Sequence, residues 1–203
     1  RLDQEDTGIN IEDKILDLLN ELKSSSLKFD CIVLSDYKKG MLTHVLTTEI
    51  IQMANKNNIP VIIDPKGYDA QKYQGATYIT PNMNEFRGLT GLNEECNEKN
   101  ILSEGKKILE ESNINNIILT RSEEGITLIR KSKSSNYPTK AIEISDVTGA
   151  GDTVVAAIAF GAAQNWDQDT IINFANLAAG VVVSKVGTAT ASIEEIEQYE
   201  SNL

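Results

Sequence analysis

The sequence predicts an α/β fold, with a mostly parallel sheet and helices on both of its faces. Short apolar runs alternate with longer amphipathic segments through the first 120 residues. Such alternation is typical of parallel strands joined by right-handed helical crossovers. The runs are continuously apolar, as strands covered on both faces are. With 203 residues, 40% of them hydrophobic, the chain can build one sizeable core.

The first half of the chain contains three predicted strands and three predicted helices. Apolar residues at helical spacing predict the first helix, with Asn10 as its N-cap. Pro65 ends the second strand, and Gly91 ends the third helix. The expected elements, in order, are helix 10–23, strand 31–35, helix 43–57, strand 60–65, strand 76–81 and helix 82–91.

The second half contains three further predicted strands and four predicted helices. A polar turn over residues 131–136 is expected between two of the strands. No internal repeat or linker interrupts the pattern, so residues 1–203 are expected to belong to a single domain. The expected elements are helix 101–111, strands 116–120, 125–130 and 140–145, and helices 151–164, 168–185 and 192–199.

Composition excludes several classes of partner. The net charge of −11 and the low isoelectric point argue against a surface for nucleic acid or anionic membranes. No apolar run reaches the roughly 18 residues of a membrane span. Two cysteines, Cys31 and Cys96, form no disulfide framework or zinc pattern, which favours a reducing, cytoplasmic setting. The charged start "RLDQED" is no signal peptide, and it lacks Met, so we expect the natural chain to begin upstream.

Polar segments follow five of the predicted strands. In open α/β sheets, ligands bind beyond the carboxyl ends of the strands. Each segment alone is weak evidence, but their convergence on one edge predicts a polar ligand there. The segments are "SDYKKG" (35–40), "DPKG" (64–67), "TPNMNE" (80–85), "TRSEEG" (120–125) and "SDVTGAGD" (145–152).

The last segment allows two interpretations. Glycines at 149 and 151 permit a turn whose N–H groups point at an anion, and a following helix adds the positive end of its dipole. Asp152 would then accept a proton from an attacking hydroxyl. Alternatively, Asp152 only caps the helix. The dinucleotide fingerprint fails because Val154 stands where a third glycine is required, and no Walker A motif is present.

Other polar residues also keep two interpretations. Asn82 and Glu85 have the spacing of a capping box, but their oxygens could also hold the water shell of Mg²⁺. Lys39 and Lys66 could each neutralise a phosphate or be merely solvated. The only histidine, His44, is expected on the surface and not as a base.

Six segments together resemble the ribokinase-like (PfkB) carbohydrate kinases, and among them the heptose 7-phosphate kinases. Those kinases occur as the N-terminal half of bifunctional heptokinase/adenylyltransferases or as separate enzymes. The resemblance runs from about Ser35 to Ser192. The segments are "VLSDYKKG", "VIIDPKG", "YQGATYITPNMNEF", "LTRSEEGITL", "DVTGAGDTVVA" and "FANLAAGVVVSKVGTATAS".

The resemblance implies a role for each motif. Asp152 would be the general base, and the backbone of Gly149, Ala150 and Gly151 would form the anion hole for the transferred phosphoryl group. Mg²⁺ and ATP are the implied cofactors. The implied contacts are Asn82, Met83, Asn84 and Glu85 at the ATP phosphates, with Glu85 holding Mg²⁺ through water; Lys66 at the phosphates or the sugar; Thr120 and Gly125 along the nucleotide; Asn176 near the adenosine; and Asp36 and Lys39 at the sugar phosphate.

The resemblance also implies an activity: ATP-dependent phosphorylation of O1 of heptose 7-phosphate, in the synthesis of ADP-heptose for lipopolysaccharide. Family members begin with about a hundred residues that carry sugar contacts and a lid, so we expect this chain to be the C-terminal two-thirds of the kinase domain and inactive alone. A homodimer is an option. The alternatives are another sugar kinase of the superfamily and a non-catalytic nucleotide-binding module.

Overall fold

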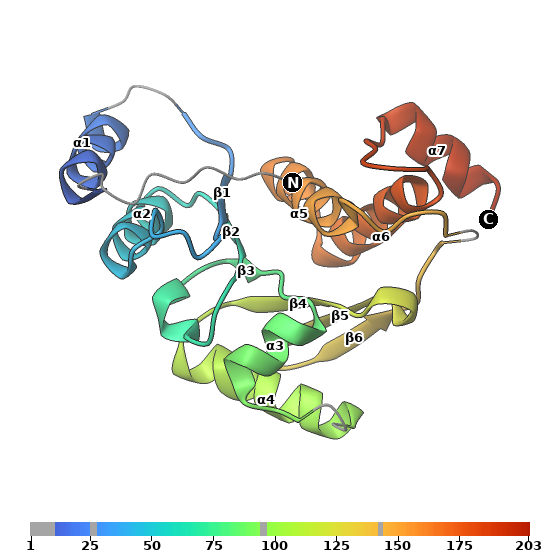
Figure 1. Ribbon diagram of the computed structural model, residues 1–203, viewed down its shortest axis with the longest axis horizontal. Coiled ribbons are helices and arrows are strands. Elements are labelled where there is room, and N and C mark those ends of the chain that lie inside the picture. Colours follow the sequence, from blue (N-terminus) through green and yellow to red (C-terminus); the bar gives the residue numbers. More distant parts are fainter. Residues whose placement is uncertain (1–10, 25–27, 94–96, 142–143) are drawn as a thin grey trace.

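The computed structural model describes residues 11–24, 28–93, 97–141 and 144–203, and it contains one mixed sheet between two layers of helices (Figure 1). The six strands lie side by side in chain order. The first four are parallel, and the last two pair antiparallel at one edge. The strands are β1 (Ile32–Ser35), β2 (Val61–Asp64), β3 (Tyr78–Ile79), β4 (Asn116–Thr120), β5 (Ile126–Arg130) and β6 (Ser134–Tyr137). The predicted α/β class with a mostly parallel sheet is confirmed.

The described helices follow the predicted order. Helix α4 begins three residues earlier than predicted, because Asn97 caps it. The predicted N-cap of α1, Asn10, lies outside the described residues. The helices are α1 (Ile11–Ser24), α2 (His44–Lys56), α3 (Met83–Thr90), α4 (Glu98–Glu111), α5 (Ala150–Ala163), α6 (Gln168–Val183) and α7 (Ile193–Ser201), with 3₁₀ turns at Ala70–Tyr73 and Ser122–Glu124.

Alternate residues of the central strands enter two different cores. In β2, Val61 and Ile63 pack with α1 to α4, whereas Ile62 packs with α5 to α7. All three side chains are 0% exposed. This alternation is what a strand covered on both faces requires. Figure 1 shows the same division, with α5, α6 and α7 grouped apart from α1 to α4.

The structure corrects the prediction between β5 and α5. The polar segment predicted as a turn over 131–136 forms most of strand β6, which pairs with β5. A polar sequence is tolerated there because β6 is an edge strand, half-exposed to water. The strand predicted at 140–145 is wrong for its described residues, which belong to no strand. Instead, the backbone N–H groups of Ser145 and Asp146 donate to the Val183 carbonyl at the end of α6.

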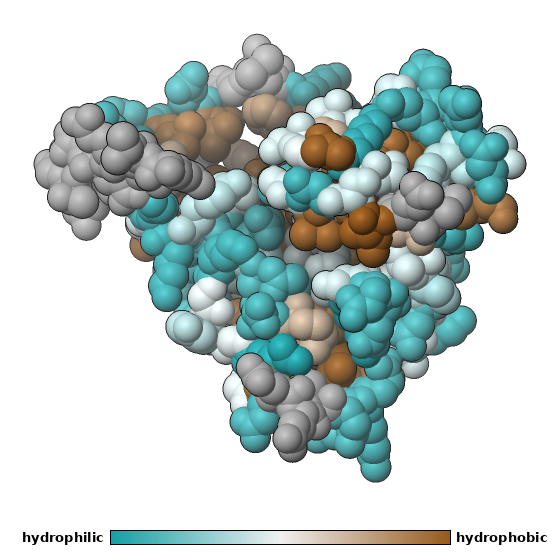
Figure 2. All heavy atoms as spheres, turned by 45° about the vertical axis from the view of Figure 1, so that its right-hand side comes forward, coloured by the Kyte–Doolittle hydropathy of each residue, from teal (hydrophilic) through white to brown (hydrophobic). Residues whose placement is uncertain are grey.

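Two surface properties bear on partners. Within the described ranges, the protein has no helix that combines the length and apolar character of a membrane crossing. On the side turned forward in Figure 2, hydrophobic surface occurs in small patches among hydrophilic side chains.

Candidate active site

Four charged side chains converge beyond the carboxyl end of β2. Asp64 is the last residue of that strand. Burial raises its pKa, and the negative charges of Glu85 and Asp152 raise it further, against the opposing charge of Lys66. An electrostatic effect of this kind requires short distances. Asp64 therefore lies within the electrostatic reach of a lysine and two carboxylates from three different segments.

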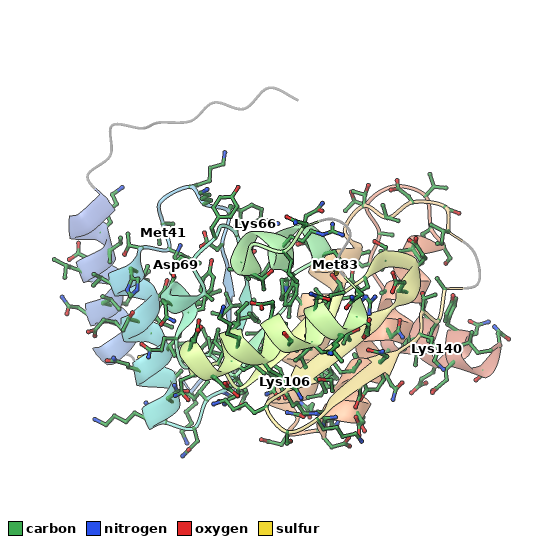
Figure 3. All side chains as sticks on the ribbon, turned by 90° about the horizontal axis from the view of Figure 1, so that it is seen from below. Met41, Lys66, Asp69, Met83, Lys106 and Lys140 are labelled. Atoms are coloured by element: carbon green, nitrogen blue, oxygen red, sulfur yellow. The ribbon has the colours of Figure 1, made fainter. Side chains whose placement is uncertain are left out.

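Lys66 and Glu85 form an ion pair between the loop after β2 and helix α3, and Figure 3 shows Lys66 beside that helix. The Glu85 side chain is 10% exposed, and the Lys66 side chain is 40% exposed. Burial lowers the pKa of Lys66, but its hydrogen bond to Glu85 and the charges of Glu85 and Asp64 outweigh burial and raise it. Lys66 is thus a fixed positive charge, partly open to solvent.

Side chains at the start of α3 accept hydrogen bonds from the first backbone N–H groups of that helix. The Asn82 side chain accepts hydrogen bonds from the N–H groups of Asn84 and Glu85, at 2.9 and 3.0 Å. Glu85 in turn accepts from the Asn82 N–H, at 2.8 Å, which completes a capping box. The side chain of Met83 packs against the core, and that of Asn84 accepts from Arg87. The capping interpretation of Asn82 and Glu85 therefore holds, and it uses the side-chain oxygen of Asn82 but not its amide N–H₂ group.

The start of α5 is different. Gly149 occupies the N-cap position in the left-handed region (φ 82°), and it makes no side-chain cap. The first backbone N–H groups of a helix have no partner within the helix. Ala150 donates to the Val147 carbonyl at 3.2 Å. Among the described residues, no side chain caps the remaining donors, those of Gly151 and Asp152.

Asp146 shapes this glycine turn. Its carboxylate accepts from the Thr148 N–H at 2.9 Å and from the Gly187 N–H at 3.2 Å. These hydrogen bonds lower its pKa, led by those from Thr148, so the carboxylate stays charged. Asp146 thereby ties the turn before α5 to the loop after α6. Gly151 has open space where a Cβ would be, so a ligand can approach its backbone closely.

The predicted nucleotide residues fall into two places. Thr120 lies beside Asn82, where its N–H donates to the Pro81 carbonyl at 3.0 Å. Gly125 and Asn176 instead meet the segment around Pro138. A Cβ on Gly125 would lie 2.7 Å from the Pro138 carbonyl carbon, and the buried Asn176 amide donates to the Pro138 oxygen at 2.6 Å. Both residues therefore have a structural reason for their identity.

The two residues predicted at the sugar phosphate have different surroundings. Lys39 is exposed and lines a hollow of about 510 Å³ at the end of β1, together with Tyr37 and Met41. Asp36 is 2% exposed. Its carboxylate accepts from Lys72, from the Tyr73 hydroxyl at 2.8 Å and from the Lys38 N–H at 2.8 Å. The side chain of Asp36 is therefore held inside the protein.

The donor set fits magnesium through water better than directly. Over the ranges that the structure describes, no group of three or more His, Cys, Asp or Glu side chains is arranged to hold a metal ion. Both oxygens of Glu85 have partners, Lys66 on one side and the Asn82 N–H on the other. Mg²⁺ commonly keeps several waters and takes one or two carboxylates plus substrate phosphates. Glu85 and Asp64 are the carboxylates that would hold Mg²⁺ in such an arrangement.

Sequence reasoning missed three residues of the site. Asp64 was within the motif "DPKG", and its place at a strand end was a signal that could have found it. Asp146 precedes the glycines, and an Asp two residues before a turn is a common backbone acceptor. Tyr73 carried no local signal, because its contact with Asp36 spans 37 residues.

The sequence of the chain matches the pfkB family of carbohydrate kinases over residues 5–196. The chain belongs to this family. The pfkB chain is 43% identical to bifunctional protein HldE of Haemophilus influenzae over 97% of its own length and 40% of that protein's. It is 40% identical to bifunctional protein HldE of Aliarcobacter butzleri over 100% of its own length and 42% of that protein's. The chain thus spans about two fifths of these curated relatives.

Solved structures show the same fold. Phosphofructokinase-2 from Escherichia coli in complex with potassium superposes with a TM-score of 0.80 at 17% identity, over 94% of this pfkB chain and 62% of that one. Arabidopsis thaliana ribokinase complexed with ribose and ATP gives 0.74 at 19% identity, over 93% and 58%. These likenesses confirm the ribokinase-like fold that the motifs implied.

Proposed function

We propose that this chain is the part of an ATP-dependent sugar kinase that binds the nucleotide phosphates and carries the catalytic base. The observation that carries the proposal is the open start of α5. Uncapped N–H donors lie there next to Asp152, and Asp152 is close enough to Asp64 to raise its pKa. A helix start with free donors favours an anion, and Lys66 adds a positive charge to the same edge.

The proposed step transfers the γ-phosphoryl group of ATP to a sugar hydroxyl. The hydroxyl proton passes to the carboxylate of Asp152, and the hydroxyl oxygen forms a bond to the γ-phosphorus. The bond from that phosphorus to the β–γ bridging oxygen breaks, and ADP leaves with the bonding electron pair. The N–H groups of Gly151 and Asp152 stabilise the charge on the transferred group, and Lys66 stabilises the phosphates.

Magnesium would neutralise charge on the ATP phosphates when bound. Glu85 would hold it through water, since its oxygens already bond Lys66 and the Asn82 N–H. Asn82 and Thr120, which lie side by side, would line the phosphate path. Gly125 and Asn176 would support the nucleotide indirectly, by fixing the segment at Pro138.

The proposed acceptor is O1 of heptose 7-phosphate, which would give the 1,7-bisphosphate for ADP-heptose synthesis. The support is the resemblance of "SDYKKG" and "DPKG" to heptose 7-phosphate kinases and the 43% identity to a bifunctional protein HldE. Lys39, exposed beside the hollow at the end of β1, is the candidate partner for the sugar phosphate. The rest of the sugar site would come from parts of the polypeptide beyond this chain.

The test is Asp152→Asn in the full natural polypeptide, with heptose 7-phosphate and ATP as substrates. We expect turnover to fall on the order of 10²–10⁴-fold, the typical contribution of a positioned base, while ATP binding persists. Asp167→Asn is the matched control. Asp167 also lies at the start of a helix, α6, where its side chain caps Thr170, and asparagine caps equally well.

Three results would overturn parts of the proposal. Near-normal turnover of Asp152→Asn would remove its role as base. Phosphorylation of ribose or fructose 6-phosphate, but not of heptose 7-phosphate, would replace the proposed substrate with that of another sugar kinase. ATP binding without phosphoryl transfer to any sugar would indicate a non-catalytic nucleotide-binding module.

A further inference from the structure

The carboxylate of Asp36 is the centre of a buried network that joins the ends of β1 and β2. Its partners Lys72 and Tyr73 both belong to the 3₁₀ turn Ala70–Tyr73. The two strand ends are adjacent, since the Asp36 N–H donates to the Asp64 carbonyl at 3.0 Å. Burial raises the pKa of Asp36, but hydrogen bonds from Lys72, the Lys38 N–H and Tyr73 outweigh burial and lower it. Asp36 is therefore a buried, fully bonded anion.

The hydroxyl of Tyr73 links the carboxylate of Asp36 to the backbone of Lys66. A hydroxyl has one proton to donate. The bond to the Asp36 carboxylate is 2.8 Å, shorter than the alternative to the Lys66 carbonyl at 3.2 Å, and a carboxylate is the stronger acceptor. Because the Tyr73 hydroxyl donates its proton in a hydrogen bond to Asp36, its oxygen is left to accept a hydrogen bond from the Lys66 backbone N–H at 3.3 Å. Asp36 thus fixes Tyr73, and Tyr73 fixes the backbone of the lysine that pairs with Glu85.

The same carboxylate also shapes the loop after β1. Lys38 has a left-handed backbone (φ 56°), which is uncommon for a residue with a side chain. Its N–H donates to Asp36 at 2.8 Å, and this bond stabilises the unusual turn. The ammonium of Lys38 in turn lies 5.0 Å from the centre of the Tyr68 ring, in the loop that carries Lys66. The two loops are therefore joined both inside the protein and at the surface.

We infer that Asp36 and Tyr73 are positioning residues for phosphoryl transfer: they hold Lys66 in the place where it meets Glu85 and the ATP phosphates. The inference rests on the proposed kinase activity and on Lys66 acting at the phosphates. Asp36 then serves the reaction without touching the substrate, since its side chain is 2% exposed and its oxygens are already bonded. The sequence motifs "SDYKKG" and "DPKG" therefore contribute to one hydrogen-bond network.

The sharpest test removes only the Tyr73 hydroxyl. Changing Asp36 itself would leave the partly buried Lys72, whose side chain is 20% exposed, without this partner and would risk unfolding. Tyr73→Phe keeps the ring, which is 1% exposed, and deletes the link between Asp36 and Lys66. Tyr78→Phe is the matched control. Tyr78 is 6% exposed and begins β3, so it lies at the amino end of the strands, away from the site.

The measurements are kcat and KM in the full natural polypeptide, together with the melting temperature of each variant. Misplacing a reacting group by about 1 Å costs on the order of 100-fold, so we expect Tyr73→Phe to lower kcat by about tenfold. Both tyrosine variants should lose similar stability, and Tyr78→Phe should keep its kcat. In a double-mutant cycle with Lys66→Met, adding Tyr73→Phe should have almost no further effect on kcat, because both changes act through Lys66.

The outcomes separate this inference from the proposed function. If Asp152→Asn is inactive while Tyr73→Phe keeps wild-type kcat, the kinase stands and the positioning role falls. Additive effects of Tyr73→Phe and Lys66→Met would overturn it as well, because they would show that Tyr73 does not act through Lys66. An unchanged kcat in Lys66→Met alone would do the same. Coupled losses in kcat, with the Tyr78→Phe control active, support the inference.

Discussion

Helices α3 and α5 both begin beyond the carboxyl ends of the strands, and both begin with a polar motif that the sequence brings to one edge. In α3, the Asn82 side chain accepts from two first-turn N–H groups and Glu85 accepts from a third. In α5, the N-cap is Gly149, and no described side chain takes the donors of the first turn. The same structural position therefore has its donors bonded internally in one helix and open in the other.

The two helix starts therefore offer different groups to the site. A capped start stabilises its own helix and has little left for a ligand, so α3 contributes side chains, chiefly Glu85 against Lys66. An uncapped start leaves backbone donors and the helix dipole for an anion. The fold replaces a side-chain cap with glycine at α5, at a cost of roughly a few tenths of a kcal/mol, at the one helix start that carries the proposed base.

Between the two helix starts, the largest expected effect comes from changing the backbone conformation at the open start of α5. Gly149→Ala places a side chain at φ 82°, and Gly91→Ala does the same at φ 72°, at the end of α3. Neither added Cβ meets an atom closer than 3.6 Å. Both variants should therefore lose about 1 kcal/mol of stability through backbone strain. Only Gly149→Ala should also lower kcat, by at least about tenfold, because it turns the anion-binding donors away.

Thermal unfolding and steady-state kinetics of the full natural polypeptide measure both effects. Equal stability loss with equal, undiminished kcat in the two variants would show that the turn before α5 is merely a turn. The difference between the open start of α5 and the capped start of α3 would then have no role in catalysis.

A smaller effect is expected from changing the cap at the start of α3. Asn82→Ala removes the cap of α3 and should cost about 0.5–2 kcal/mol, as Asn97→Ala should at the cap of α4. Asn82→Asp keeps a capping oxygen, so it should restore the melting temperature. It should still raise the KM for ATP, by about tenfold or less, because a negative charge replaces the amide beside the phosphates.

Asn97→Asp is the control for the added charge, since Asn97 caps α4 and not α3. If Asn82→Asp recovers both stability and KM, then Asn82 acts only as a cap. In that case α3 supports the site through Glu85 alone, and the contrast with α5 becomes sharper.

The sequence predicted the sheet well because its strands depend on local patterns. Continuous apolar runs marked β2 and β4, and the capping-box spacing marked the start of α3 within a residue. It failed where tertiary contacts decide. The alternating segment at 140–145 has the pattern of a strand, but β6 already occupies the sheet edge, and the backbone at Ser145 bonds to Val183 instead.

The same limit applies to the site. Asp152, Glu85 and Lys66 were identified because they follow strands or start helices, and the structure brings all three near Asp64. The role of Asp36 at the sugar phosphate was implied by the family resemblance. Its partner Tyr73 lies 37 residues away, and no local pattern in the sequence encodes that contact. The position of a residue at a strand end therefore predicts that it lies near the site. Tertiary packing decides whether its side chain is buried or open to a ligand.

The smallest expected effect concerns Asp64, which lies between the two helix starts. Its pKa is raised by burial and by the charges of Glu85 on α3 and Asp152 on α5. A raised folded-state pKa means that ionisation of Asp64 opposes folding at neutral pH. Asp64→Asn should therefore raise the melting temperature, by roughly 1–3 °C for a chain of this size. The gain should vanish as the pH falls below the ordinary carboxyl pKa, where wild-type Asp64 is protonated in both states.

Asp36→Asn provides a comparison of opposite sign at the neighbouring strand end. The pKa of Asp36 is lowered, so its charge stabilises the fold at neutral pH, and that stability is lost as the pH falls through the folded-state pKa. Asp36→Asn should thus lower the melting temperature at pH 7, with a deficit that shrinks in acid. If Asp64→Asn also destabilised the protein at pH 7, then Asp64 would not lie in the combined field of Glu85 and Asp152. The two helix starts would then not share one site.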